Sequence, residues 1–101
     1  MASRLDLQIQ LEELLGSRNV YYQPPESIKL KYPCIIYSLS DIDDYKANNN
    51  SYKRSRKYEL LLIDNDPDSE FVDSILHMPY CRFDRSYSAS GLNHFVFSIY
   101  Y

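Results

Sequence analysis

Tryptophan is absent from this 101-residue chain, and glycine occurs only twice, at Gly16 and Gly91. So little glycine excludes a glycine-rich phosphate-binding loop, which needs several glycines close together. No apolar run approaches the roughly 20 residues of a membrane-spanning helix, so we expect no membrane segment. The opening MASRLDLQIQLEELLG carries too many acidic and amide side chains for a secretory signal peptide.

Cysteine is scarce as well. Cys34 and Cys81 lie far apart in the chain, each among strand-forming residues, so we expect two buried free thiols in a reducing cytoplasm. The net charge is −3. A general nucleic-acid binder normally presents a basic surface, so this balance disfavours that class.

Tyrosine, in contrast, is abundant: there are 11 tyrosines and 4 phenylalanines. A tyrosine combines an apolar ring with a polar tip, which suits a half-buried surface or an interface between proteins. The content of 45% hydrophobic and 25% charged residues is typical of a globular protein. We expect one domain that spans residues 1–101.

Two helices are predicted from apolar spacing and capping residues. Ser3 can cap a helix that runs to about Leu15 and ends at Gly16. A second helix is expected to begin with Asp66 as its N-cap and Pro67 as its first residue, and to end before Pro79. The apolar stripes of the two helices consist of Leu7, Leu11, Leu14 and Leu15 in the first and of Phe71, Val72, Ile75 and Leu76 in the second.

Strands are predicted at 20–22, 34–40, 57–64, 81–88 and 92–101, the last two forming a hairpin. The order α-β-β-β-α-β-β predicts an α+β domain, with a mainly antiparallel sheet of four to five strands and two helices packed on one face. Period-two alternation predicts the residues that face the helices: Phe95, Phe97, Ile99 and Tyr101 in the last strand, and Cys81, Phe83, Tyr87 and Ala89 in its partner.

The segment DIDDYKANNNSYKRSR, residues 41–56, is predicted to be a long, exposed polar loop. It carries a basic cluster, whereas the residues that follow the strand at 57–64 are acidic. A basic loop and an acidic shoulder on one small domain suit head-to-tail association. The candidate contact residues are Tyr45, Asn48, Asn49, Asn50, Tyr52, Lys53, Arg54, Arg56, Asp64, Asp66 and Asp68.

Enzymatic and metal sites find little support. The aspartates at 64, 66 and 68 have calcium-loop spacing, but Ser69 and Ile75 occupy the positions that need glycine and glutamate. His94, Asp84 and a nearby serine could form a triad, yet no nucleophile elbow holds a serine. We therefore expect no catalytic residues, no metal and no cofactor.

The basic cluster leaves two further interpretations open. Lys53, Arg54, Arg56 and Lys57, interleaved with Tyr45 and Tyr52, could form a small nucleic-acid-binding module. The simpler alternative is a solvated polar loop.

Three blocks of sequence carry a resemblance to a known family. They are KYPCIIYSLSDIDDYKANNNSYK, YELLLIDNDPDSEFVDSIL and CRFDRSYSASGLNHFVFSIYY, and they follow an N-terminal helix. As a set, covering nearly three quarters of the chain, they resemble the tail terminators, or tail-completion proteins, of long-tailed bacteriophages and related prophages. Neck and head-completion proteins of similar size are the alternative.

The resemblance implies a non-catalytic virion protein, assembled in the host cytoplasm, that forms a ring with typically six-fold symmetry. Such a ring sits at the head-proximal end of the tail tube, stops tube polymerisation and offers a docking surface to the head. The implied partners are further copies of the chain, the tail tube protein and a head-completion or connector protein. DNA passes through the ring without being bound specifically, and the acidic balance of the chain fits that passage.

Overall fold

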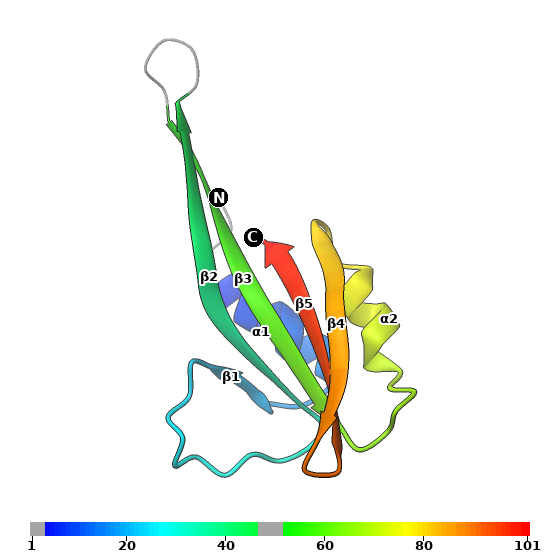
Figure 1. Ribbon diagram of the computed structural model, residues 1–101. Coiled ribbons are helices and arrows are strands. Elements are labelled where there is room, and N and C mark those ends of the chain that lie inside the picture. Colours follow the sequence, from blue (N-terminus) through cyan, green and yellow to red (C-terminus); the bar gives the residue numbers. More distant parts are fainter. Residues whose placement is uncertain (1–3, 47–51) are drawn as a thin grey trace.

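A five-stranded sheet with two helices on one face forms the domain, which confirms the predicted α+β class (Figure 1). The computed structural model describes residues 4–46 and 52–101. The strand order across the sheet is β1-β2-β3-β5-β4. The elements are α1 (Arg4–Leu15), β1 (Val20–Tyr22), β2 (Cys34–Lys46), β3 (Tyr52–Asp64), α2 (Phe71–Leu76), β4 (Cys81–Ala89) and β5 (Leu92–Tyr100).

The sheet is mixed, because β1 runs parallel to β2 while all other neighbouring strands are antiparallel. β3 lies in the centre, between β2 and β5. Its apolar run Leu60–Ile63 is covered on both sides, with Leu60 and Leu62 buried on the helix side and Ile63 buried on the other. The continuous apolar run therefore marks the central strand, as is usual for strands covered on both faces.

The core lies between the helices and one face of the sheet. Helix α1 presents its predicted leucine stripe to this face, with Leu7, Leu11 and Leu15 buried. Short helix α2 contributes Ile75, whereas Leu76 is exposed, contrary to the predicted face. The sheet residues of the same cluster are Val20, Ile35, Tyr37, Tyr58, Leu60, Leu62, Phe97 and Ile99. No helix in the described part of the chain is long and apolar enough to span a membrane.

Helix α1 is fixed to the sheet by a polar contact inside this core. The hydroxyl of Tyr37, on β2, donates a hydrogen bond to Oε1 of Gln8 and accepts one from Arg4 Nη1 at 3.1 Å. Gln8 also donates from Nε2 to the carbonyl oxygen of Val20 at 3.0 Å. Arg4 lies over the ring of Tyr22, 4.3 Å from its centroid. Because a buried tyrosine hydroxyl must find partners, this network fixes where the helix sits.

The predicted loop is wrong at residues 41–46 and 52–56, while 47–51 lie outside the described residues. Strand β2 continues to Lys46, and β3 already begins at Tyr52, so the two strands form a long hairpin. The polar residues show no alternating apolar pattern that would predict a strand. The backbones of the two strands are nevertheless paired as far as Lys46 and Tyr52. Polar side chains are compatible with a ribbon that is not covered by a core, because only the backbone ladder is needed to pair the strands.

The predicted start of the second helix is also wrong. Asp66 does not cap a helix: its Oδ1 accepts the Asp68 N–H at 2.9 Å and so closes a turn. The helix begins only at Phe71, whose N–H lies 3.4 Å from Ser69 Oγ. A short aspartate side chain can cap a turn as well as a helix, and local sequence does not distinguish the two.

The last hairpin matches its prediction, but β4 contains a bulge between Phe83 and Arg85. Before the bulge Phe83 pairs with Phe97, on the helix face. After it Tyr87 pairs with His94, on the opposite face, so the expectation that Cys81, Phe83, Tyr87 and Ala89 share one face is wrong. An extra residue shifts the alternation by one, which moves every later side chain to the other face.

Both cysteines are free thiols, as expected. Cys34 is fully buried, whereas Cys81 is only partly buried. Burial raises the pKa of each thiol to about 11, with the negative charge of Asp84 adding to the effect at Cys81. Neither cysteine is therefore ionised at neutral pH.

We predict that Phe97→Ala destabilises the protein by about 3–5 kcal/mol, because the ring is fully buried and its loss leaves a cavity. The control is Tyr80→Ala, which removes a ring that is 81% exposed and should change stability by less than about 0.5 kcal/mol. Urea unfolding followed by circular dichroism measures both. Equal effects of the two substitutions would contradict the location of the core.

Candidate interaction surface

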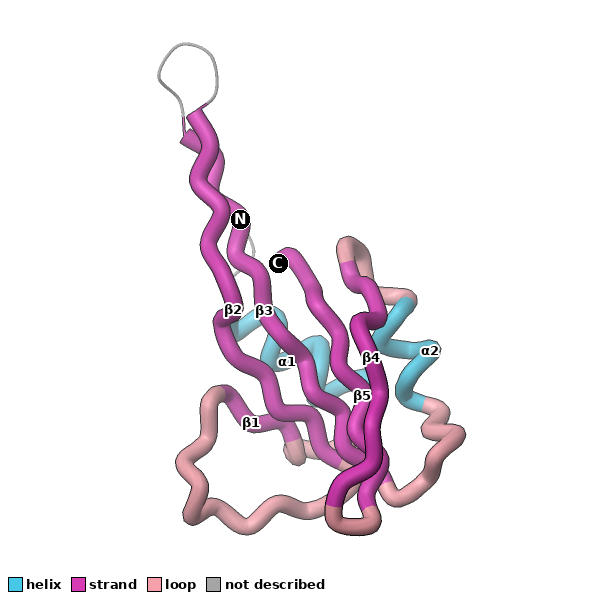
Figure 2. Tube along the Cα trace, viewed as in Figure 1, coloured by secondary structure: helices cyan, strands magenta, loops and turns pink. Residues whose placement is uncertain are grey.

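The β2–β3 hairpin extends beyond the sheet as an arm, which we define as residues 42–46 and 52–56. β1 pairs with β2 only as far as Tyr37, and β5 pairs with β3 only from Lys57. A single further bond joins the Tyr101 N–H to the Arg56 carbonyl oxygen at 3.0 Å. Apart from that bond, the two arm strands pair only with each other, and they project beyond the rest of the sheet (Figure 2). The molecule is accordingly elongated, with extents of 52 × 26 × 23 Å.

Five of the eleven candidate contact residues lie in the arm. Tyr45 lies opposite Lys53 in the ladder, and Asp44 lies opposite Arg54. Acidic and basic residues thus stand in register along the same ribbon, rather than forming a purely basic loop. The remaining arm candidates are Tyr52 and Arg56, whereas Asn48, Asn49 and Asn50 lie outside the described residues.

The acidic candidates Asp64, Asp66 and Asp68 come together in the segment after β3, which we call the acidic turn (residues 64–70). Asp64 is buried, and its carboxylate accepts the Asp66 N–H at 3.2 Å and the Ser69 hydroxyl at 2.7 Å. Asp64 and Asp66 therefore hold the turn together. Asp68 and Glu70 are exposed, and their side chains take no part in these bonds, although the Asp68 N–H donates to Asp66.

The acidic turn is not built as a cation site. Among the described residues, no group of three or more histidine, cysteine, aspartate or glutamate side chains is arranged to hold a metal ion. The Asp64 oxygens that a cation would need are already bonded within the protein. The turn thus has a structural explanation that needs no metal.

The structure does not assemble the imagined triad either. His94 stacks on Tyr87, with ring centroids 4.7 Å apart and 12° between the planes. Asp84 instead accepts hydrogen bonds from the Ser98 hydroxyl and, at 3.2 Å, from Arg82 Nε. The histidine and the aspartate are therefore engaged with different partners, and nothing in this arrangement activates a serine.

Sequence reasoning did not predict a pocket on the sheet face away from the helices. A pocket of about 290 Å³ lies there between the ends of β3, β5 and β4. The register places Arg82 opposite Ser98 and Lys57 opposite Tyr100, which brings these side chains to one place. Period-two alternation could have put Arg82 and Ser98 on one face, but not Lys57, because strand order is not readable from the sequence. The lining residues are Lys57, Tyr80, Cys81, Arg82, Ser98 and Tyr100.

The chain matches no protein-family model and no curated protein to which it was compared.

The ionisation of Asp84, which lies beside the pocket, contributes to the stability of the folded protein. The hydrogen bond from Ser98 lowers the pKa of Asp84, and Arg82 and the positive charge of Lys57 lower it further against an opposing effect of partial burial. Because the pKa of Asp84 is lower in the folded than in the unfolded state, its ionised form stabilises the folded protein at pH values above the ordinary aspartate pKa of about 3.9. That stabilisation disappears as the pH falls through the lowered pKa.

We predict that Asp84→Asn reduces the free energy of unfolding at pH 7 by less than about 1 kcal/mol, because the site faces solvent. The difference from wild type should shrink below about pH 4, where the aspartate itself becomes protonated. Denaturant unfolding between pH 2.5 and 7 measures it, with the exposed loop residue Glu26 changed to Gln as the control. A difference that stays constant with pH would contradict this role of Asp84.

Proposed function

We propose that this chain is a non-enzymatic structural subunit of a phage virion, a tail terminator that forms a ring on the head-proximal end of the tail tube. The observation that carries the proposal is the β2–β3 arm. Each of its strands belongs to a 13-residue strand whose other half is in the core, so the arm is continuous with the sheet yet projects beyond it. The resemblance of the three sequence blocks to tail terminators supports the same function.

An isolated two-stranded ribbon is only marginally stable in water. In the arm, β1 no longer covers the outer edge of β2, and β5 no longer covers the outer edge of β3. The backbone groups on these edges can pair with a strand of another chain, a common mode of association between proteins. A neighbouring subunit supplies the contacts that the chain itself does not provide for this ribbon.

The exposed aromatic residues favour contact with other proteins. Tyr80, Phe83, Tyr87 and Tyr100 are between 40% and 81% exposed, and all belong to β4, its preceding turn or β5. Exposed aromatic side chains are enriched where proteins meet. β4 is also an edge strand, so its outer backbone groups have no strand partner in the described sheet. The domain thus presents contact surfaces at both the arm and the β4 edge.

In this role the chain has three protein partners: further copies of itself, the tail tube protein and a head-completion or connector protein. The ring stops the tube from growing and gives the head a surface on which to dock. DNA passes through its centre, and the net charge of −3 disfavours tight binding to it. The protein resides in the virion after assembly in the host cytoplasm.

We predict a closed oligomer in solution, with a mass of about 72 kDa for six chains of 12.0 kDa each. Light scattering behind size exclusion, over a wide concentration range, measures the mass, and negative-stain microscopy shows whether the particles are rings. Replacing both Arg54 and Arg56 by Glu should weaken the oligomer if the arm contacts a neighbour, whereas the exposed loop change Lys29→Glu should not. A chain that is monomeric at every concentration, and that does not cap purified tail tubes, would contradict the proposal.

A small nucleic-acid-binding module is the second candidate function. One observation, the pairing of β2 with β3 in the arm, supports it. The arm is a two-stranded ribbon in which Tyr45 faces Lys53 and Lys46 faces Tyr52, so basic and aromatic residues alternate in register. Such a ribbon has dimensions that a DNA major groove accepts.

This second candidate predicts that Arg54→Ala with Arg56→Ala weakens binding to a fluorescent oligonucleotide, and that binding by the wild type falls steeply as salt rises. Fluorescence anisotropy between 50 and 200 mM salt measures both. For the tail terminator we expect no useful affinity for short DNA or RNA at physiological salt, with or without the two arginines.

A further inference from the structure

Helix α1 presents two large aliphatic side chains to solvent. Leu5 is 61% exposed and Ile9 is 53% exposed, although Leu7 and Leu11 of the same helix are completely buried. Leu5, Ile9 and the exposed Glu13 follow one another at intervals of four residues, so they form one row on the helix, which we call the outward stripe. Because Leu7 and Leu11 face the sheet, the outward stripe lies on the far side of α1. Aliphatic side chains grouped beside charged ones on a surface mark a site of contact with another protein.

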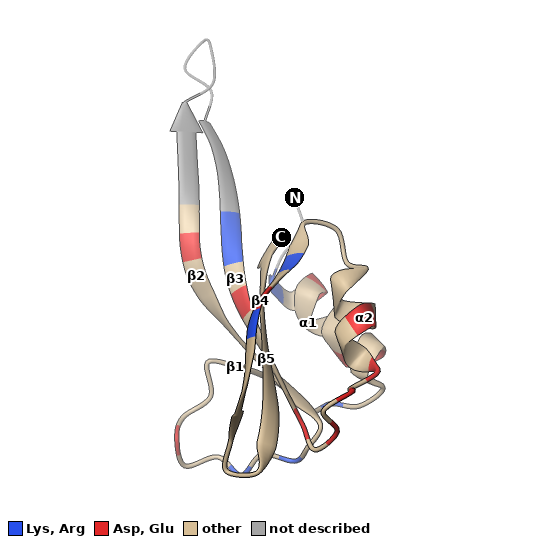
Figure 3. Cartoon of the chain, turned by 45° about the vertical axis from the view of Figure 1, so that its right-hand side comes forward, with Lys and Arg blue, Asp and Glu red and all other residues tan. Residues whose placement is uncertain are grey.

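The surroundings of the outward stripe are acidic. We define the helix layer as residues 4–18 and 66–77, which comprise α1, α2 and the segments next to them. It contains seven acidic residues and two basic ones, and Figure 3 shows acidic residues along α2 and the turn before it. Arg4 is directed toward the sheet, where it bonds Tyr37, rather than toward the outward stripe. The acidic residues are Asp6, Glu12, Glu13, Asp66, Asp68, Glu70 and Asp73, and the basic ones are Arg4 and Arg18.

The arm carries a surplus of the opposite sign. Its residues, 42–46 and 52–56, include four basic and two acidic ones. At the base of the arm, Ile42 and Arg56 lie directly opposite each other in the ladder, and both are exposed. The arm therefore presents an aliphatic side chain next to a basic one, whereas the outward stripe presents an aliphatic side chain next to an acidic one.

The spacings within these two pairs agree. Residues directly opposite each other in an antiparallel ladder, as Ile42 and Arg56 are, have Cβ atoms about 5 Å apart. Residues four apart on a helix, as Ile9 and Glu13 are, have Cβ atoms about 5–6 Å apart. Ile42 can therefore meet Ile9 while Arg56 meets Glu13.

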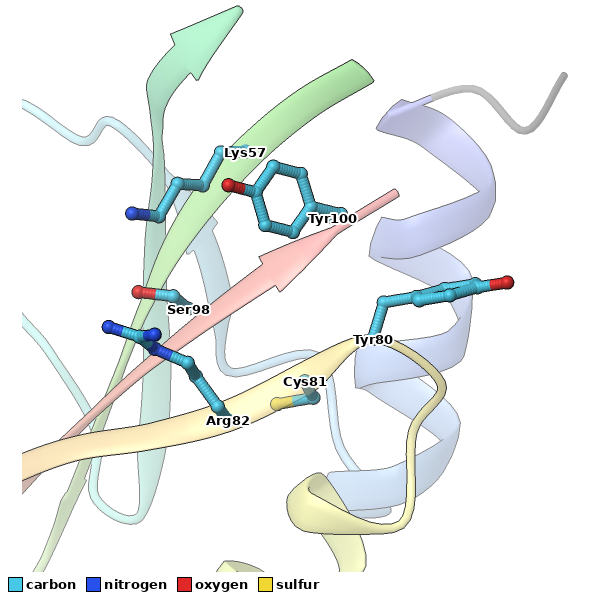
Figure 4. A pocket seen from close by; sticks show the side chains of 6 residues that line it. All are labelled: Lys57, Tyr80, Cys81, Arg82, Ser98 and Tyr100. Atoms are coloured by element: carbon cyan, nitrogen blue, oxygen red, sulfur yellow. The ribbon is translucent and has the colours of Figure 1, made fainter. Parts of the chain in front are cut away.

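The opposite face of the sheet offers the arm no such partner. Figure 4 shows Lys57, Ser98 and Arg82 pointing to the same side there. The register places Asp41 opposite Lys57 and Glu59 opposite Ser98, so acidic and basic groups are mixed on that face. The helix layer, in contrast, is predominantly acidic, and it is the surface that attracts a basic arm.

We propose that the base of the arm docks on the outward stripe of α1 in a second copy of the chain. In this contact Ile42 packs on Leu5 and Ile9, and Arg56 lies beside Glu13. This inference rests on the proposed ring and specifies one of its contacts. Charge complementarity, together with the exposed aliphatic residues on both sides, identifies the occupant.

One chain cannot make this contact with itself. The arm continues the sheet, whereas the outward stripe lies on the side of α1 that faces away from the sheet. The contact therefore joins two different patches on two copies and is head-to-tail. Repeated head-to-tail contacts close into a ring when the rotation between neighbours allows it.

The first test exchanges the two charges in the full-length chain. Arg56→Glu and Glu13→Arg each set like charges against each other at every contact, whereas a chain with both substitutions restores an opposite pair. Lys29→Glu and Glu26→Arg make the same charge changes on an exposed loop and are the matched controls. Circular dichroism confirms that each variant is folded, and light scattering measures the protein concentration at half-maximal assembly.

The second test removes the aliphatic part of the contact. Ile9→Gln keeps a residue that favours a helix but takes the apolar side chain out of the outward stripe. Ile28→Gln removes an isoleucine that is also exposed, in the loop between β1 and β2, and is the control. We expect Ile9→Gln to need about tenfold more protein for half-maximal assembly, and the control to behave as the wild type.

We expect Arg56→Glu and Glu13→Arg each to need at least about fivefold more protein for half-maximal assembly. The double variant should return toward the wild-type value, and added salt should weaken the wild-type assembly. If the wild type assembles and the single variants behave like the loop controls, the docking on α1 is wrong while the ring stands. If the double variant does not recover, the two residues do not meet and the inference is also wrong. If the wild type never assembles, both proposals fall.

A different occupant of the outward stripe is the remaining outcome. If Ile9→Gln leaves the mass of the oligomer unchanged but abolishes capping of purified tail tubes, the outward stripe binds the tube protein rather than a second copy, and the inference is overturned.

Discussion

The pairing of β2 with β3 is the interaction on which the rest of the structure depends. The two 13-residue strands share one ladder, from Cys34↔Ile63 to Lys46↔Tyr52. At one end of the ladder, β1, β5 and the helices cover the apolar residues and form the core. At the other end the same ladder continues without cover as the arm. The arm is therefore held by the core through its own backbone, rather than attached by a flexible connection.

Two bulges interrupt the register of the sheet. One lies between Leu39 and Asp41, where β2 leaves the sheet, and the other between Phe83 and Arg85, in the edge strand. A bulge reverses the alternation of side chains and increases the local twist. In β4 it turns Tyr87 toward His94 on the helix-free face. The irregularity in β2 thus lies at the base of the arm, and the one in β4 brings Tyr87 to the outer sheet face.

Charge is arranged differently from the simple basic loop and acidic shoulder expected from the sequence. The arm places acids opposite bases within its own ladder, as at Asp44↔Arg54. The pocket lined by Lys57 and Arg82 lies on the sheet, where the register also places Asp41 opposite Lys57 and Glu59 opposite Ser98. Acidic and basic residues are therefore interspersed on the sheet face as they are along the arm.

The sequence by itself determined the class of fold, the order of its elements and most of the core. Apolar periodicity is a local property, and it correctly placed the leucine stripe of α1 and the inward row of β5 with Phe97 and Ile99. That polar residues 41–46 and 52–56 continue as strands emerged only from the tertiary structure, because strand pairing there comes from backbone bonds and leaves no apolar pattern. It alone brought Lys57 to Arg82, since neighbours across a sheet are set by strand order and register, which no local pattern encodes.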